Sequence, residues 1–144
     1  MRRSIYPFTA SFVLTIILVG CSSPGELSIS QAWARPATAG NNGAVYFMVE
    51  NPTSQEDALI NVRSRVADAA EVHLSIVSES GVVSMEPQET VHFAPDSQVE
   101  FAPGGLHVML IRLNQDLFEG DVVELILEFE RAGEIEIMAP IGEP

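Results

Sequence analysis

Lysine is absent from this chain of 144 residues, and cysteine occurs once. The formal net charge is −13, and without Arg2 and Arg3 the remaining five arginines face 20 acidic residues, a charge of −15. So acidic a chain argues against nucleic acid as a partner, because affinity for nucleic acid depends on basic residues that neutralise phosphates. The single cysteine, Cys21, excludes a disulfide within the fold.

Motifs of the common hydrolases and nucleotide-binding enzymes are also missing. The chain has no G-x-S-x-G nucleophile elbow, no H-E-x-x-H zinc motif and no glycine-rich phosphate loop. Its acidic residues mostly alternate with apolar residues, which is typical of the solvated face of a strand. We therefore predict that the protein is not an enzyme.

The N-terminus has the features of a secretion signal. Arg2 and Arg3 form a positive end, and the apolar stretch 12–19 that follows is too short to span a bilayer. The stretch runs into "LVGC", residues 18–21, which resembles the lipobox of bacterial lipoproteins, in which the cysteine is lipidated. The alternative is that Cys21 is an ordinary residue near a signal-peptide cleavage site.

A domain organisation follows from the lipobox. We predict a lipoprotein signal peptide over residues 1–20, lipidation of Cys21, a tether over 21–27 and a folded domain over 28–144. This organisation predicts that the domain lies outside the cytoplasm, held to a bacterial membrane by a lipid anchor.

Short strand-like runs, separated by turn residues, fill the chain after the tether. No segment keeps a helical period over three turns, so the predicted class is all-β. Alternation is clearest in "DVVELILEFE", where the apolar residues at 123, 125, 127 and 129 face one way. Two sheets that each bury one apolar face make a β-sandwich, and this many antiparallel strands usually connect as a Greek key.

His73 lies in the run "EVHLSIV", where neighbouring side chains point to opposite faces of a strand. The apolar set from Val72 to Ile76 predicts the core face, so His73 points the other way. The "SESG" that follows predicts a hairpin centred near Glu79, which would bring Met85 opposite or nearly opposite His73. Directly paired residues have Cβ atoms about 4.5–5.5 Å apart, close enough to share one ion.

His107 and Met109 alternate with apolar residues in "LHVMLIRL". We expect these two side chains to share one face of a strand, opposite the core face. Ile111 and Leu113 continue the face of His107 and need cover from another element. The predicted core face carries Leu106, Val108 and Leu110.

Two imidazoles and two thioethers form a distinctive set of metal ligands. Thioether sulfur is soft and suits Cu(I), whereas it is a poor ligand for magnesium or calcium; imidazole suits copper in either oxidation state. Taken one at a time, a methionine on a sandwich strand is more often a core residue, and a lone histidine is more often a polar surface residue. His92, Met48, Met138 and Trp33 are predicted to be structural.

The spacing of the four residues carries more information than each residue alone. The pattern is His73, eleven residues, Met85, 21 residues, His107, one residue, Met109. It resembles the signature of the periplasmic copper chaperones called PCu(A)C. "AWARPATAGNNGAVYFMVEN", "APGGLHVMLIRL" and "FEGDVVELILEFERAGEIEI" are similar to further segments of that family, and the resemblance covers nearly all of residues 28–138.

The resemblance implies a cupredoxin-like Greek-key β-sandwich in which His73, Met85, His107 and Met109 bind Cu(I). It also implies delivery of copper to a membrane-bound acceptor, either the copper A centre of cytochrome c oxidase subunit II or another acceptor. Two features depart from the family. Leu74 stands where many members have a methionine, and the tail "APIGEP" lacks the histidines and methionines of some members, so we predict no second copper site there.

Two other functions remain open at this point, and a third is excluded. A copper buffering or resistance protein would use the same ligands without a dedicated acceptor. A metal-free structural lipoprotein would have the four candidate ligands scattered or buried apart. A blue-copper electron-transfer protein is excluded, because its site needs a cysteine thiolate with two histidines, and Cys21 lies at the end of the signal.

Overall fold

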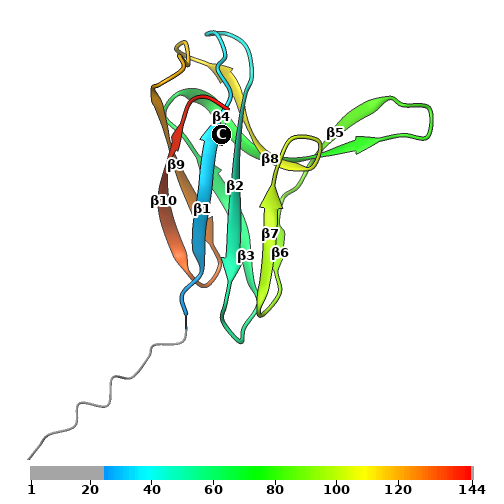
Figure 1. Ribbon diagram of the computed structural model, residues 1–144, viewed down its shortest axis with the longest axis vertical. Helices are drawn as coiled ribbons and strands as arrows, with labels where there is room; N and C mark the ends of the chain where they lie inside the picture. Colours follow the sequence, from blue (N-terminus) through cyan, green and yellow to red (C-terminus); the bar gives the residue numbers. More distant parts are fainter. Residues whose placement is uncertain (1–24, 144) are drawn as a thin grey trace, which may run out of the picture.

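The computed structural model describes residues 25–143, which form ten β-strands and no helix (Figure 1). The strands are β1 (Ser28–Ala34), β2 (Gly43–Asn51), β3 (Asp57–Arg63), β4 (Ala67–Val77), β5 (Val83–Pro87), β6 (Val91–Phe93), β7 (Ser97–Phe101), β8 (Leu106–Leu113), β9 (Val122–Phe129) and β10 (Gly133–Pro140). The predicted all-β class is confirmed. The predicted signal peptide and Cys21 lie outside the described residues.

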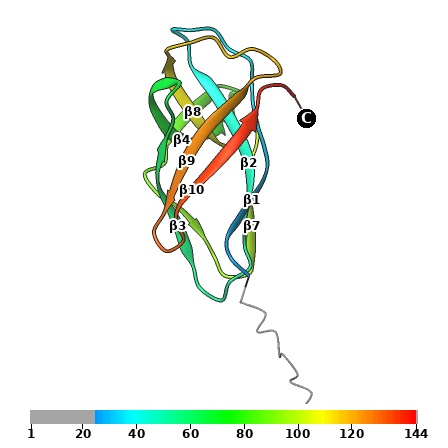
Figure 2. The same cartoon turned by 90° about the vertical axis from the view of Figure 1, so that its left-hand side faces the viewer.

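The strands form two sheets that pack face to face. One sheet has six strands in the order β1-β2-β7-β8-β4-β5, and the other has four in the order β10-β9-β3-β6. In Figure 2 the β9–β10 hairpin lies in front of the larger sheet. The chain crosses from one sheet to the other after β2, β3, β5, β6 and β8, so strands distant in sequence pair, as in a Greek key. The predicted sandwich is confirmed.

The core lies between the two sheets and is made by alternation along the strands. On β9, Val123, Leu125, Leu127 and Phe129 are all buried, as predicted. They meet the inner face of β2, which carries Val45, Phe47 and Val49. The outer face of the six-stranded sheet is therefore free to carry other chemistry.

Strands β7 and β8 form one line along β2, interrupted by a loop. Both pair antiparallel with β2, through Phe47 with Phe101 and through Val45 with Val108. Residues 102–105 leave this line as a turn, in which Gly104 has φ of 82°, a conformation that glycine adopts without a steric penalty. The carbonyl of Gly105 then accepts a hydrogen bond from the Ser75 N–H at 3.1 Å.

The predicted alternation of side chains along β8 is wrong at the C-terminal end of the strand. Leu113 does not continue the face of His107; it is buried in the core. The reason is Arg112, whose φ of 52° breaks the alternation of the strand. A Cβ on Gly43 would touch both Leu110 and Leu113, so these leucines lie on the same side of the sheet. Only Ile111, half-buried, stays outside.

The β4–β5 hairpin extends away from the sandwich body (Figure 1). Its pairs are His73 with Pro87, Ser75 with Met85 and Val77 with Val83, so its centre is Ser80 rather than Glu79. Met85 is thus nearly opposite His73, two pairs along the hairpin. Counting Ile76 in the core face was wrong: that side chain is exposed. The hairpin at this point has passed beyond the cover of the second sheet, so its inner face also meets solvent.

Asn51, a buried polar residue, connects two loops at the end of the molecule away from the β4–β5 hairpin. The Asn51 side-chain amide donates to the carbonyls of Gln55, Phe93 and Ala94 at 2.8, 3.0 and 3.1 Å. Its oxygen accepts from the backbone N–H of Thr53 at 3.2 Å. Asn51 therefore joins the β2–β3 turn to the loop after β6.

Asp57 has a similar role next to Asn51. Its two carboxylate oxygens accept hydrogen bonds from the backbone N–H groups of Ala58, Arg131 and Ala132 at 2.8–2.9 Å. The β9–β10 turn is thereby fixed to the start of β3. At the same end, Gly25 lies against Pro52, and a Cβ on this glycine would be 2.7 Å from the Pro52 Cγ atom.

Within residues 25–143 there is no helix with the length and apolarity needed to cross a membrane.

Candidate metal site

The two candidate histidines are direct partners on neighbouring strands. His73 on β4 pairs with His107 on β8, and their rings point to the outer face of the six-stranded sheet. The ring centroids are 6.1 Å apart. His107 is only 4 % exposed, and the His73 side chain is 12 % exposed. Both imidazoles are therefore largely shielded from water although neither lies in the core.

The two candidate methionines lie on the same face, on either side of the histidine pair. Met109 is two residues beyond His107 on β8 and pairs with Glu71 on β4 and Ala44 on β2. Met85 pairs with Ser75 on the hairpin and is 51 % exposed. Met85, His107 and Met109 together line a surface hollow of about 450 Å³, whereas His73 lies beside His107 outside this hollow.

A hydrogen bond fixes the orientation of the His107 ring. Its Nδ1 atom is 3.1 Å from the carbonyl oxygen of Gly105. A carbonyl can only accept, so Nδ1 is the protonated nitrogen and Nε2 is left with its lone pair. Metal-binding histidines usually have their second nitrogen held in this way, which fixes the tautomer and the ring orientation. The interruption between β7 and β8 supplies this carbonyl.

His73 is oriented by a carboxylate. Its Nε2 atom is 3.0 Å from a carboxylate oxygen of Glu71, which assigns the proton to Nε2. The other nitrogen, Nδ1, is buried and has no hydrogen-bond partner. A buried polar atom without a partner is uncommon in a folded protein, and a bound cation is one way to satisfy it. The residues present therefore fit a metal ion that accepts nitrogen and sulfur donors.

The sulfur of Met109 has a polar neighbour. The side-chain amide of Asn42 donates to this sulfur at 3.7 Å. Asn42 also accepts a hydrogen bond from the Arg112 N–H at 3.0 Å, so it is held from both sides. These contacts restrict the position of Met109, whereas no comparable contact is found for Met85 within the described residues.

A row of rings that the sequence did not indicate continues from the histidines across the sheet. Tyr46 on β2 is buried on the outer face, with its ring centroid 6.3 Å from that of His107. Trp33 on β1 packs on Tyr46 at 4.5 Å, and the Arg35 guanidinium lies 5.6 Å from the Tyr46 ring centroid. Trp33 is a packing aromatic, as expected, but it packs outside the core. The sequence signal for Tyr46 was its alternation with Val45 and Phe47 in "GAVYFMVEN".

The environment of Tyr46 affects its ionisation. Burial raises the pKa of Tyr46, and the positive charge of Arg35 lowers it in part. The phenol is therefore neutral over the whole physiological range, and its ring shields the His107 imidazole.

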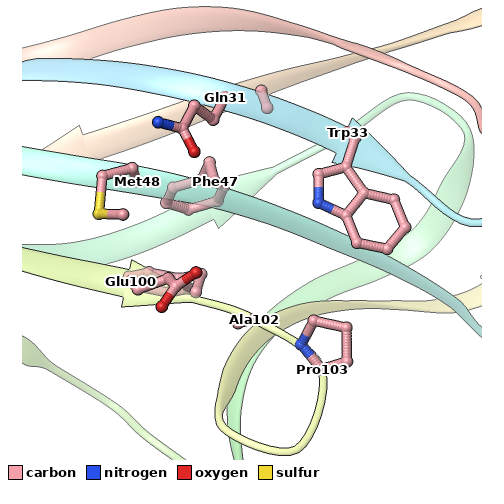
Figure 3. A pocket seen from close by; sticks show the side chains of 9 residues that line it. Gln31, Trp33, Phe47, Met48, Glu100, Ala102 and Pro103 are labelled. Atoms are coloured by element: carbon pink, nitrogen blue, oxygen red, sulfur yellow. The ribbon is translucent and has the colours of Figure 1, made fainter. Parts of the chain in front are cut away.

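A second hollow, of about 470 Å³, lies beside the first on β1, β2 and β7 (Figure 3). Trp33 and Pro103 lie at one end of it, and Met48 at the other. Pro103 lines both hollows. Met48 lies among Gln31 and Glu100, with no histidine lining this hollow.

His92 and Met138, which the sequence predicted to be structural, belong to the smaller sheet and not to this face. His92 on β6 is exposed, and its Nδ1 atom is 3.2 Å from a carboxylate oxygen of Glu56. Met138 on β10 is exposed on the smaller sheet. In the part of the chain that the structure describes, no three His, Cys, Asp or Glu side chains form a metal-binding group. A site in this region would therefore depend on the thioethers.

The geometry bears on the metal-free alternative. A structural sandwich without metal predicts that the four candidates are scattered or buried apart. Instead His73, Met85, His107 and Met109 share one face of one sheet, on three consecutive strands. This arrangement argues against the metal-free alternative.

Comparison with known sequences identifies a matching family and similar proteins. The family described as "Putative lipoprotein LpqE-like" matches residues 27–141. "Putative lipoprotein Lxx21020" of Leifsonia xyli subsp. xyli is 24% identical over 157 aligned positions, covering 99% of this chain and 94% of the relative. "Uncharacterized protein RP573" of Rickettsia prowazekii is 29% identical, covering 74% of this chain and 62% of the relative.

Comparison with solved structures confirms the resemblance to PCu(A)C domains. The copper-bound PCuAC domain from PmoF2 superposes with a TM-score of 0.69 and 28% identity, covering 85% of this chain and 97% of that domain. The apo PCuAC domain from PmoF1 superposes with a TM-score of 0.68 and 28% identity, covering 85% of this chain and 98% of that domain. Apo-DR1885 from Deinococcus radiodurans superposes with a TM-score of 0.58 and 18% identity, covering 100% of this chain and 97% of that chain. At this identity the likeness concerns the fold alone.

Proposed function

The chain belongs to the LpqE-like family, and from this membership, the likeness to PCuAC domains and the geometry of the candidate site we propose that it is an extracytoplasmic lipoprotein that binds Cu(I) and passes it to a membrane-bound acceptor. The proposed ligands are His73, Met85, His107 and Met109. The observation that carries the proposal is the cross-strand histidine pair, flanked by two thioethers, in which the buried Nδ1 atom of His73 has no partner. The protein makes and breaks no bonds within a substrate; copper is its cargo.

The chemistry of the four side chains supports Cu(I) over other ions. Two thioethers and two neutral imidazoles add no negative charge, which suits a monovalent soft cation. None of the four has to become an anion before it can bind the ion, in contrast to a cysteine thiol. The copper-bound state of the PmoF2 PCuAC domain supports copper as the ion.

The hydrogen bonds of the two histidines support specific donor atoms. His107 would bind through Nε2, because its Nδ1 atom is held by Gly105. His73 would bind through Nδ1, because its Nε2 atom is held by Glu71. Both rings are oriented before copper arrives, so little ordering of side chains opposes binding.

Neighbouring residues hold the two methionines to different degrees. This difference suggests which methionine releases copper first. Met109 lies on a strand with buried neighbours and is held by Asn42. Met85 lies on the projecting hairpin and is half exposed. We expect an incoming ligand of the acceptor to displace Met85 first, after which the remaining three ligands release copper in turn.

The acceptor is proposed to be the copper A centre of cytochrome c oxidase subunit II, as the PCu(A)C resemblance implies. A lipid anchor at Cys21 would keep the domain close to a membrane acceptor. Such confinement raises the effective concentration of the two proteins without any new contact between them.

The first test is a Cu(I) titration of the full-length protein in detergent against a chromophoric chelator. We expect one tight equivalent in the parent and clearly weaker binding in His107→Ala and in Met109→Ala. His92→Ala and Met138→Ala are matched controls, because they remove the same side chains elsewhere on the surface. Equal binding by all five proteins would overturn the proposed site, provided that thermal unfolding shows each variant to be folded.

The second test separates delivery from copper buffering. Delivery predicts that copper moves from the loaded protein to an apo copper A domain, and that deletion of the gene lowers oxidase activity. Buffering predicts that copper stays bound in the first experiment and that deletion lowers copper tolerance instead.

A further inference from the structure

The β4–β5 hairpin concentrates the exposed apolar side chains of the molecule. Five of the nine large hydrophobic residues exposed in residues 25–143 belong to it. They are Ile76, Val77, Val82, Val83 and Met85. An exposed apolar cluster of this kind on a soluble domain usually marks an interaction surface.

Part of this cluster continues the face that carries the candidate ligands. Val77 and Val83 are direct partners, two pairs beyond Ser75 and Met85, so their side chains lie on the same face as Met85. Val77 is 63 % exposed and Val83 is 59 % exposed. Both valines line the hollow that Met85, His107 and Met109 also line. A molecule that reaches Met85 from solvent therefore meets the two valines.

The hairpin is also free to receive a partner. β5 is the edge strand of the six-stranded sheet, and all five of its residues are exposed. The hairpin extends beyond the body of the sandwich (Figure 1), so its tip is open to a partner.

Charge indicates what kind of partner fits. Residues 66–111 contain no lysine or arginine, and Arg35 is the single arginine that lines the hollow. Glu71, Glu79, Glu86 and Glu89 are all exposed on or beside the hairpin. Anionic phospholipid would be repelled by these carboxylates, and a second copy of the chain would bring like charges together. A basic protein surface would be attracted.

We propose that Val77 and Val83, with the surrounding glutamates, form the docking surface for the protein that takes copper from Met85. The partner has an apolar patch next to its copper ligands and basic residues around it. This inference rests on the proposed function, because it assigns the surface through which that delivery takes place. Docking here brings the partner over the most exposed candidate ligand, so contact and ligand exchange occur together.

The test compares two double variants of the full-length protein in detergent. Val77→Ser/Val83→Ser removes the apolar pair, and Ile60→Ser/Val122→Ser removes two exposed apolar side chains on the smaller sheet as a control. Because all four are exposed, we expect little change in folding. The measurements are Cu(I) affinity by chelator competition, and the rate of copper transfer to an apo copper A domain, followed by separating the two proteins and determining copper in each.

We expect both variants to bind Cu(I) as the parent does. Transfer from Val77→Ser/Val83→Ser should be about tenfold slower or more, the loss typical of truncated residues at the centre of an interface. The control should transfer at the parent rate. Equal transfer rates for both variants would overturn the docking surface and leave the proposed function intact.

The remaining outcomes separate the two proposals. Failure of the parent to bind Cu(I) overturns the proposed function itself. Binding without transfer overturns delivery, and the docking surface with it. Weaker Cu(I) binding by the valine variant overturns docking, because the valines would then act by positioning Met85. Loss of self-association, or of binding to anionic phospholipid vesicles, in that variant alone would overturn docking in favour of that other partner.

Charge gives an independent test. Glu79→Lys/Glu86→Lys should slow transfer and weaken its dependence on ionic strength, whereas Glu134→Lys/Glu136→Lys on β10 should not. An identical salt dependence for the two variants would overturn the predicted basic rim of the partner.

Discussion

His73 and His107 are opposite each other on β4 and β8, and a different protein oxygen holds one nitrogen of each ring. The oxygen is a carboxylate for His73 and a backbone carbonyl for His107. Only the carboxylate can be removed by substitution without a change in the main chain. Glu71 is therefore the residue through which the orientation of the pair can be tested.

Glu71→Ala should lower the Cu(I) affinity by about tenfold or more, the usual effect of losing a residue that orients a metal ligand. The Cu(I) affinity of Glu71→Gln should lie between those of Glu71→Ala and the parent, because the amide oxygen can still accept a hydrogen bond from the His73 Nε2–H group. Glu50→Ala, which removes an exposed carboxylate near the end of β2, is the control. Chelator competition is the measurement, and an affinity unchanged in Glu71→Ala would contradict the assigned role.

Tyr46 should make the protein less stable at alkaline pH. Burial raises its pKa above the ordinary value of 10.0, with partial opposition from Arg35, so the native state favours the neutral phenol. This contribution to stability is complete below the pKa of the unfolded chain and is lost as pH rises through the raised value.

The free energy of unfolding of the parent should therefore fall more steeply above pH ~10 than that of Tyr46→Phe. Urea titrations at several pH values measure this difference. Tyr46 is the only tyrosine after residue 20, so the absorbance of the phenolate in a protein that begins at residue 21 reports its pKa directly. A normal titration near 10 would contradict the prediction.

Asn51→Ala should destabilise the fold by about 1–3 kcal/mol, because three carbonyls and one N–H lose a partner in a buried place. Cu(I) affinity should not change, since Asn51 lies at the end of the sandwich away from the hairpin. Asn61→Ala, which removes one exposed hydrogen bond to Glu128, should have a much smaller effect on the free energy of unfolding. Comparable losses in both variants would count against the role given to Asn51.

Leu113→Ala and Ile111→Ala test the break in β8. Leu113 lies in the core because Arg112 reverses the alternation, so its truncation should lower the free energy of unfolding by about 2–5 kcal/mol. Ile111 is half-buried on the outer face, and its truncation should have a clearly smaller effect. Chemical denaturation measures both values, and the reverse order would show that the alternation runs on as the sequence predicts.

Alternation predicted most of the architecture because most strands keep it. Val123 and Leu125 are buried where the pattern puts them, and His107 and Met109 lie away from the core for the same reason. Alternation could not predict the reversal at Arg112, because a residue other than glycine with positive φ has no reliable sequence signature. Alternation also could not show that Ile76 lies beyond the edge of the four-stranded sheet. Where that sheet ends cannot be read from the sequence of β4.

The candidate site was predicted by spacing rather than by alternation alone. The sequence separations of His73, Met85 and His107 have meaning only once strands β4, β5 and β8 are known to be neighbours. Tyr46 was missed because burial on the outside of a sheet depends on what covers it. Here Trp33 on β1 packs on the Tyr46 ring, and Pro103 in the loop before β8 lines the same hollow as Tyr46.

If Cys21 carries the proposed lipid anchor, the position of Gly25 governs how the domain can meet other molecules. This residue lies against Pro52 at the narrow end of the sandwich, whereas the β4–β5 hairpin projects sideways from the long axis (Figure 1). A domain held to a bilayer through its N-terminus can stand upright on that end and turn about its long axis. The hairpin would then sweep a circle parallel to the bilayer, and encounters with neighbouring membrane proteins would be lateral.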